Sequence, residues 1–325
     1  MIKVKVHELK LTLRPAERIT ADANGDAAPR TRHCGAPLPS ETIRERFEAE
    51  LGLRLWAVGL IDGDGVVGLE WTNAARTLWD PLLKVSLHVV DARANHALVR
   101  GLGLGRDGRS GRTLTLRVRS RRAWRGLLLP YFLDHPLRTV KAFDVTTVAR
   151  ALAMSADDAR AAVPVLVRAL TQNKLQGNPS PIWGLSGPTH DFSTVPPAVL
   201  AHVVHDLRLA GFVEAEGSFG ITRDGSHGFA LGQAYDTTAV AAVHARFGVV
   251  SRLKFRPGYV MVDTKRRRVL NHVVRVLIGR CHGMKGIILR IWARSLRRRD
   301  PQASARARRI IRALVKRDPK LQIMS

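Results

Sequence analysis

Four acidic residues in two short segments of matching pattern are the groups in this chain best suited to hold a metal ion. The segments read AVGLIDGDG, from Ala57 to Gly65, and LAGFVEAEG, from Leu209 to Gly217. Each runs through a glycine, two bulky apolar residues, an acid, a small residue, a second acid and a glycine, and the copies lie 152 residues apart. Repetition at the length of a domain predicts two related units, each with acids at the end of an apolar helix.

The small residues of the two segments predict a close contact between helices. They are spaced four apart, as Gly59 and Gly63 in the first segment and Gly211 and Ala215 in the second. Each pair therefore lies on one helix face, along which two backbones can approach. Contact there would bring Asp64 and Glu216 together at helix C-termini, where the dipoles are negative. Two carboxylates about 4 Å apart repel by roughly 4 kcal/mol at an effective dielectric of 20. A divalent cation such as Mg²⁺ relieves that repulsion and can activate water for attack on a phosphodiester.

The composition favours a polyanionic partner. The 325 residues include 53 Lys and Arg against 27 Asp and Glu, a formal net charge of +26. The cations spread along the whole length, and no apolar run approaches the roughly 20 residues of a spanning helix, so nucleic acid is expected rather than a membrane. The two cysteines, Cys34 and Cys281, cannot build a disulfide scaffold or a cysteine zinc site. The N-terminus lacks the apolar core of a secretory signal, so an intracellular protein is predicted.

Hydrophobic periodicity and turn residues divide the chain into five regions. Residues 1–39 form an N-terminal extension, 40–174 a first half-domain with a trailing helix, 175–193 a linker rich in Gly, Pro and Ser, 194–299 a second half-domain, and 300–325 a basic tail. Each half reads as helix, two strands, helix, two strands, helix, with Thr194 capping the first helix of the second half. The tail contains a short amphipathic helix, expected either as a solvated extension or as a phosphate contact.

The two acidic segments resemble the paired motifs of single-chain LAGLIDADG homing endonucleases, over residues 40–296. The resemblance implies an α+β fold of two pseudo-symmetric αββαββα half-domains, each with a four-stranded antiparallel sheet, that together form a DNA-binding saddle. In that family the last acid of each motif is the metal ligand, which implies Asp64 and Glu216 here. Gly63 and Ala215, the residues before these acids, are included in the expected metal site.

Further residues match the family in each half. A family lysine near the scissile phosphate follows a proline by five positions, as Lys141 does in YFLDHPLRTVKAFD. Lys285 takes the equivalent place in IGRCHGMKGIIL, although Arg280 stands where proline is expected. The family's water-positioning glutamine at the end of the second strand corresponds to Gln233 in FALGQ. The first-half segment VSLHV ends in Val89 instead, so the two strand cuts are expected to be unequal.

The polar faces of the strands are expected to read the DNA target, because every second side chain of a sheet can face base edges and phosphates. The candidates are Lys84, Ser86, His88, Thr115, Arg117 and Arg119 in the first half, and Arg252, Lys254 and Arg256 in the second.

The sequence thus predicts a monomeric, Mg²⁺-dependent endonuclease, with Mn²⁺ as a substitute, that cuts both strands of a long asymmetric duplex. Intron-encoded synthesis in a mitochondrion or chloroplast is the expected setting. An intron RNA maturase with vestigial acids is the main alternative, and intron RNA its partner. A noncatalytic DNA-binding repressor is a third hypothesis.

Overall fold

The computed structural model describes residues 40–104, 108–185, 191–192, 195, 200–201 and 204–316. The expected N-terminal extension, the Thr194 cap and the tail beyond residue 316 lie outside the described residues. Within the described part, no helix is both long enough and apolar enough to cross a membrane.

The first half is built around a four-stranded antiparallel sheet of order β1-β2-β4-β3. Its elements, in chain order, are α1 (Ser40–Asp64), β1 (Gly65–Trp71), β2 (Trp79–His88), the short helical turn η1 (Val89–Asp91), α2 (Ala92–Gly101), β3 (Gly108–Ser110), β4 (Thr113–Val118), α3 (Arg121–Ala123), the π-helical turn η2 (Trp124–Leu128), α4 (Leu129–Asp134), α5 (Lys141–Ala153), α6 (Ala156–Gln176) and η3 (Pro181–Trp183). The acidic segment ends α1 at Asp64, and β1 follows at once, as the sequence predicts.

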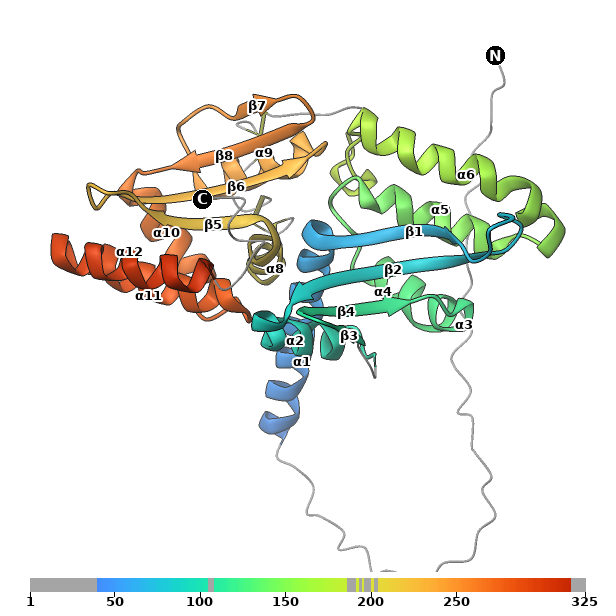
Figure 1. The fold of residues 1–325 in the computed structure, drawn as a ribbon, viewed down its shortest axis with the longest axis horizontal. Coiled ribbons are helices and arrows are strands. Elements are labelled where there is room, and N and C mark those ends of the chain that lie inside the picture. The colour runs from blue at the N-terminus through green and yellow to red at the C-terminus, as the bar shows by residue number, and fades with distance from the viewer. Residues whose placement is uncertain are drawn as a thin grey trace, which may run out of the picture. The chain divides into compact units, whose positions relative to one another are not determined.

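The second half repeats this plan with a sheet of order β5-β6-β8-β7. Its elements are α8 (Asp206–Glu216), β5 (Gly217–Ile221), β6 (His227–Ala234), α9 (Thr237–Phe247), β7 (Lys254–Arg256), β8 (Tyr259–Thr264), α10 (Arg267–Leu277), α11 (Met284–Arg298) and α12 (Pro301–Val315). The register is also repeated, since Gly65 pairs with Val85 and Gly217 with Leu231. The expected α+β fold with two four-stranded antiparallel sheets is confirmed (Figure 1).

Strict alternation along β2 shows how each sheet is formed. Leu83, Val85 and Leu87 are buried, whereas Lys84 and Ser86 between them remain partly exposed. Side chains of a strand point alternately to its two faces, so one face joins the core and the other stays open. The buried face packs with the helices into a continuous apolar core that includes Trp56, Trp124 and Trp292.

Two helical segments appear that the sequence pattern did not predict. One is the stretch α3–η2–α4, in which a π-turn and Pro130 break the regular helical period. The other is α10, a strongly amphipathic helix that buries Val269, Leu270 and Val273 on its apolar face. In addition, α8 begins at Asp206, after a turn at Val204, rather than as a continuous helix from the expected Thr194 cap.

The helix of the basic tail has a counterpart in the first half. α6 packs on α5 and β1, and α12 packs on α11 and β5. Ala307 and Ile311 of α12 are buried in the core. The segment expected as a tail therefore contributes a helix that is packed on the second sheet in the same way as α6 on the first.

Candidate active site

The two acidic segments meet through their glycines, as their spacing predicts. A β-carbon on Gly59 would overlap the carbonyl oxygen of Arg208, and one on Gly211 would overlap the carbonyl oxygen of Trp56. One turn further on, Gly63 faces the β-carbon of Ala215, and a side chain there would meet Glu216. The backbones of α1 and α8 thus approach more closely than any larger residue at these positions would permit.

Asp64 and Glu216 are the last residues of these helices, so the contact places both acids at one end of the interface. Each of the two lysines predicted for the site lies within electrostatic reach of both acids. The structure therefore brings together Asp64, Glu216, Lys141 and Lys285, two from each half.

Each lysine binds the end of the acidic helix in its own half. The Lys141 ammonium donates to the carbonyl oxygen of Asp62 at 2.8 Å and to that of Gly63. Lys285 donates to the carbonyl oxygen of Ala215 at 2.5 Å. These carbonyls are the ones that a helix C-terminus leaves without partners, and a cation there also faces the negative end of the dipole.

Both lysines are less basic than usual. Burial lowers the pKa of Lys141, and the nearby carboxylates, Asp62 first, oppose that effect. Burial likewise lowers the pKa of Lys285, against the charge of Asp64 and Glu214.

Gln233 lies beside the acid of its own half. With its amide nitrogen turned toward Glu216, Gln233 donates to Oε1 at 2.7 Å and to Oε2 at 3.3 Å. The matching strand register places Leu87, rather than Val89, at the equivalent position of the first half. Leu87 is buried and apolar, so no amide reaches Asp64 from that strand position.

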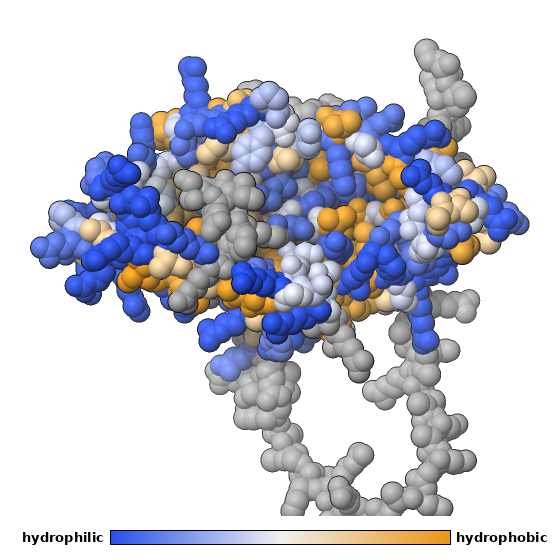
Figure 2. Space-filling model, in the orientation of Figure 1, coloured by the Kyte–Doolittle hydropathy of each residue, from blue (hydrophilic) through white to orange (hydrophobic). Residues whose placement is uncertain are grey.

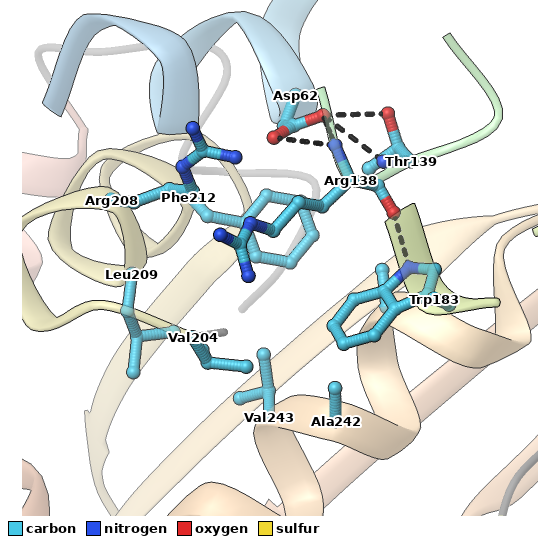
Figure 3. Close-up of a pocket in the computed structure, with 11 residues that line it drawn as sticks. Asp62, Arg138, Thr139, Trp183, Val204, Arg208, Leu209, Phe212, Ala242 and Val243 are labelled. Atoms are coloured by element: carbon cyan, nitrogen blue, oxygen red, sulfur yellow. Dashed lines mark hydrogen bonds between the residues drawn. The ribbon is translucent and has the colours of Figure 1, made fainter. Parts of the chain in front are cut away.

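The first acid of each motif binds backbone instead of solvent. Asp62 is buried and accepts hydrogen bonds from the Arg138 and Thr139 amides and from the Thr139 hydroxyl (Figure 3). Glu214 is also buried and accepts from the His282 amide at 2.8 Å. Burial raises the pKa of Glu214 to about 7. Each of these acids fixes the segment that leads to the lysine of its own half.

A small cavity beside Asp62, lined also by Arg208 and Trp183, has a volume of about 30 Å³ (Figure 3). That space suits a water molecule rather than a substrate.

A second pair of acids joins each lysine segment to the other half. Asp236, at the start of α9, accepts from the amide of Val140 at 2.7 Å. Asp91, before α2, accepts from the amide of Met284 at 2.7 Å. Val140 and Met284 each directly precede a lysine of the site. Burial raises the pKa of Asp236 to about 7.

The predicted DNA-reading residues of the first half share the open face of their sheet. Lys84 pairs with Arg117 and Ser86 with Thr115, whose hydroxyls lie 3.2 Å apart, while His88 lies opposite Thr113. Arg119 directly follows β4. Glu70 binds both arginines of this face at 2.6 Å. Partial burial works against the ionised carboxylate, but these hydrogen bonds lower the pKa of Glu70.

The predicted residues of the second half are less regular. Lys254 and Arg256 lie on the short edge strand β7, and Arg252 lies in the loop before it. Lys254 forms an ion pair with Asp263 at 2.6 Å. The structure thus groups six candidates on one sheet in the first half, and leaves three at the sheet edge in the second.

The donor set at the helix interface is compatible with a hydrated divalent cation. Within the described residues no group of three or more His, Cys, Asp or Glu side chains forms a metal cage. Two carboxylates, with the carbonyls of Gly63 and Ala215 beside them, leave several positions to water, and Mg²⁺ keeps its waters readily. A carbonyl has two lone pairs, so the lysine contacts do not exclude a metal contact.

Sequence reasoning missed several of these residues. Asp62 and Glu214 are visible in the motif, and their repetition could have marked them as a second matched pair. Asp91 and Asp236 carry a weaker signal, since each precedes a helix and is most simply interpreted as its N-cap. Glu70, the counterion of the arginines, has no sequence signal beyond its place on a strand.

Comparisons with known proteins agree with this architecture. No family model matches the chain. A curated relative, the probable intron-encoded endonuclease Cox1-I1b of Schizosaccharomyces pombe, is 24% identical over 276 residues, which cover 80% of this chain and 68% of that protein.

Solved structures are similar over most of the described chain. The meganuclease I-SmaMI bound to DNA matches with a TM-score of 0.55 and 18% identity, over 80% of this chain and 95% of its own. The LAGLIDADG meganuclease I-AabMI matches with a TM-score of 0.58 and 17% identity, over 79% and 97%. Both solved structures share with this chain the arrangement of two four-stranded sheets and their helices. The chain has the fold of the LAGLIDADG homing endonucleases, with both motifs on one polypeptide.

Proposed function

We propose that the protein is a site-specific DNA endonuclease that hydrolyses one phosphodiester in each strand of a long asymmetric duplex. The observation that carries this proposal is the grouping of Asp64, Glu216, Lys141 and Lys285 at the paired ends of α1 and α8. Two related half-sites at one interface suit a substrate with two antiparallel strands. The high positive charge of the chain suits binding to the phosphate backbone.

Each group of the site would have a distinct role in hydrolysis. Asp64 and Glu216, with the carbonyls of Gly63 and Ala215, would hold Mg²⁺ or Mn²⁺. Such an ion would polarise the scissile phosphate and lower the pKa of a bound water. Lys141 and Lys285 would each place a cation beside one scissile phosphate and stabilise the charge that develops on it. Gln233 would orient a water on the Glu216 side. The polar sheet faces would fix the register of the duplex.

The relatives support an endonuclease that acts on duplex DNA with a divalent cation. One I-SmaMI structure contains uncleaved target DNA in the presence of calcium ions, and another contains cleaved DNA. The relative from Schizosaccharomyces pombe is described as intron-encoded. We accordingly infer a divalent cation, a duplex DNA partner, action as a single chain, and an intron-borne origin in an organelle.

The test is selection of cleaved targets from a randomised duplex library, with Mg²⁺ and with EDTA. The Asp64→Asn, Glu216→Gln double variant should lose cleavage by roughly 10³-fold or more, the scale on which transition-state electrostatics act. A double variant of two exposed acids, Asp134→Asn and Asp157→Asn, is the matched control and should cut normally. Full cutting by the Asp64 and Glu216 variant would refute the roles assigned to these acids, and cutting in EDTA would refute the divalent cation. A library left uncut with Mg²⁺ and with Mn²⁺ would refute the nuclease function.

A further inference from the structure

A wide cleft runs between the second sheet and α12. It has a volume of about 1020 Å³, far more than the cavity beside Asp62. Small uncharged residues of β5 and β6 form part of its floor, among them Ser218, Gly220, Gly228 and Ala230. The charged residues Arg223, Asp263, Lys265 and Lys285 also line the cleft. One wall is α12, which contributes Arg308, Arg309 and Arg312. Figure 2 shows hydrophilic residues gathered over the part of the surface where α11 and α12 lie in Figure 1.

Within the part of the chain that the structure describes, some cations near the sheets are already paired with acids, whereas the arginines of this wall are not. Arg117, Arg119 and Lys254 are held by Glu70 and Asp263. Among the described residues, no ion pair is formed by Arg309 or Arg312, both exposed, and Nε of Arg308 is buried without a hydrogen-bond partner. Helix α12 contains four arginines and no acid, whereas its counterpart α6 contains three cations and two acids. Uncompensated cations along one cleft favour an anionic occupant.

We propose that the arginines of α12 bind backbone phosphates of duplex DNA that lies along the second sheet. The inference rests on the proposed function and adds a contact to it. The small side chains of β5 and β6 leave room for the DNA backbone. The arginines would neutralise its phosphates without reading the bases.

The salt dependence of binding to a duplex of arbitrary sequence tests this proposal. The Arg309→Gln, Arg312→Gln variant should reduce the slope of log affinity against log salt by about two, because each lost phosphate contact removes about one. The matched variant on the counterpart helix, Arg160→Gln and Arg168→Gln, should leave the slope unchanged. Equal losses in both variants, or no loss in the α12 variant, would overturn the proposal. So would a slope change seen only with single-stranded intron RNA. The slope needs no cleavage, so failure of the nuclease proposal would be seen separately.

The crossed contacts of Asp91 and Asp236 carry a second, independent inference. Asp236 accepts from Val140, which precedes α5, and Asp91 accepts from Met284, the first residue of α11. Each acid therefore binds the free amides at the start of a helix in the other half, where a negative charge also favours the dipole. Asp91 makes no side-chain cap to its own helix α2.

Other contacts of the lysine segments cross in the same way. Arg208 of α8 donates to the carbonyl oxygen of Pro136 at 2.5 Å, and Trp56 of α1 packs edge-on against His282 at 4.8 Å. A β-carbon on Gly283 would lie 2.6 Å from Asp91 and 2.9 Å from Glu214, so these acids close around that position.

The geometry points to Asp91 and Asp236 as positioning residues that act across the interface, each on the lysine of the opposite half. Each would set the position of the lysine in the opposite half, so that neither half-site is complete until the interface has formed. This inference also depends on the proposed role of the lysines.

Strand-specific cutting of a selected target tests whether each acid acts on the lysine of the opposite half. Asp91→Ala should slow the same strand as Lys285→Met, and Asp236→Ala the same strand as Lys141→Met, each by about 10- to 100-fold, the usual cost of losing an orienting contact. Asp91→Asn keeps an oxygen that can accept from Met284 and should restore most of the rate. Equal slowing of both strands, or slowing of the opposite strand, would overturn the inference. Amide exchange at Met284 should accelerate in Asp91→Ala even in a protein that does not cut, which separates the contact from the nuclease proposal.

Discussion

The two halves of the protein use equivalent residues at the helix interface and different residues around it. At the interface, the matched residues are Asp62 and Glu214, Asp64 and Glu216, Lys141 and Lys285, and Asp91 and Asp236. Around these pairs, the first half has Pro136, Leu87 and Asp144 where the second has Arg280, Gln233 and Ile288. A close contact between two backbones permits few residue types, whereas the positions around it can be filled by different side chains in each half.

The shared interface can be broken at Gly59. Gly59→Ala should destabilise the protein by about 1–3 kcal/mol or more, because the new methyl group overlaps the Arg208 carbonyl and the backbones must separate. Chemical denaturation measures the loss in the free energy of unfolding. Gly126→Ala is the matched control, because Gly126 is also helical and nothing lies within 4 Å of its added β-carbon. That variant should be neutral or gain up to about 1 kcal/mol. Equal effects in the two variants would contradict the close contact.

Asp144 distinguishes the cores of the two halves. It is fully buried beside Lys174, at 3.7 Å, where the second half has the buried Ile288. Burial raises the pKa of Asp144 to about 6, so this residue makes the folded state bind a proton more tightly than the unfolded chain does. Its contribution to stability is complete below about pH 4 and is lost as the pH rises through about 6.

Asp144→Asn should therefore flatten the fall in stability between about pH 4 and 6, by on the order of 1–3 kcal/mol. Thermal unfolding across that range measures it. Asp157→Asn, a change at an exposed acid of α6, should leave the curve of the parent protein unaltered. If Asp144→Asn keeps the original pH dependence, the fall in stability comes from another buried acid.

The residues of the interface were more predictable than the residues around it, and for a physical reason. Spacing along one helix reports which residues share a face, so the motif predicted both the approach of α1 to α8 and the placement of Asp64 and Glu216. The crossed contacts of Asp91 and Asp236 depend on how the halves pack, which no local period records. Prediction of the helices failed around Pro130, where the irregular backbone interrupts the helical period. It also missed α10, although the apolar residues of α10 recur at helical spacing. The sequence predicted Val89 as the first-half equivalent of Gln233, whereas the strand register gives Leu87. Register depends on how two strands pair, which the end of an apolar run does not show.

Gln233 should make the two strand cuts unequal. Gln233→Leu gives the second half the residue type that the first half has at Leu87, and should slow the cut that depends on Glu216 by about tenfold, or 1.4 kcal/mol. End-labelled duplex, followed strand by strand, measures the ratio of the two rates, which should move toward one. Gln233→Glu, which places a like charge beside Glu216, should slow the cut further. A ratio unchanged by both variants would exclude the water-orienting role.

The smallest expected effect concerns the counterions of the sheet faces. Glu70 holds Arg117 and Arg119, whereas Asp263 holds only Lys254. Glu70→Gln should tighten DNA binding a few-fold, since exposed ion pairs contribute at most about 1 kcal/mol and each competes with a phosphate. Asp263→Asn should tighten it less, because it frees one cation instead of two. Titration of a labelled duplex at low and high salt would show the gain at low salt only, as screening requires. Weaker binding by Glu70→Gln would mean that Glu70 orients the arginines for the bases, and the first sheet would then be a preorganised reading surface.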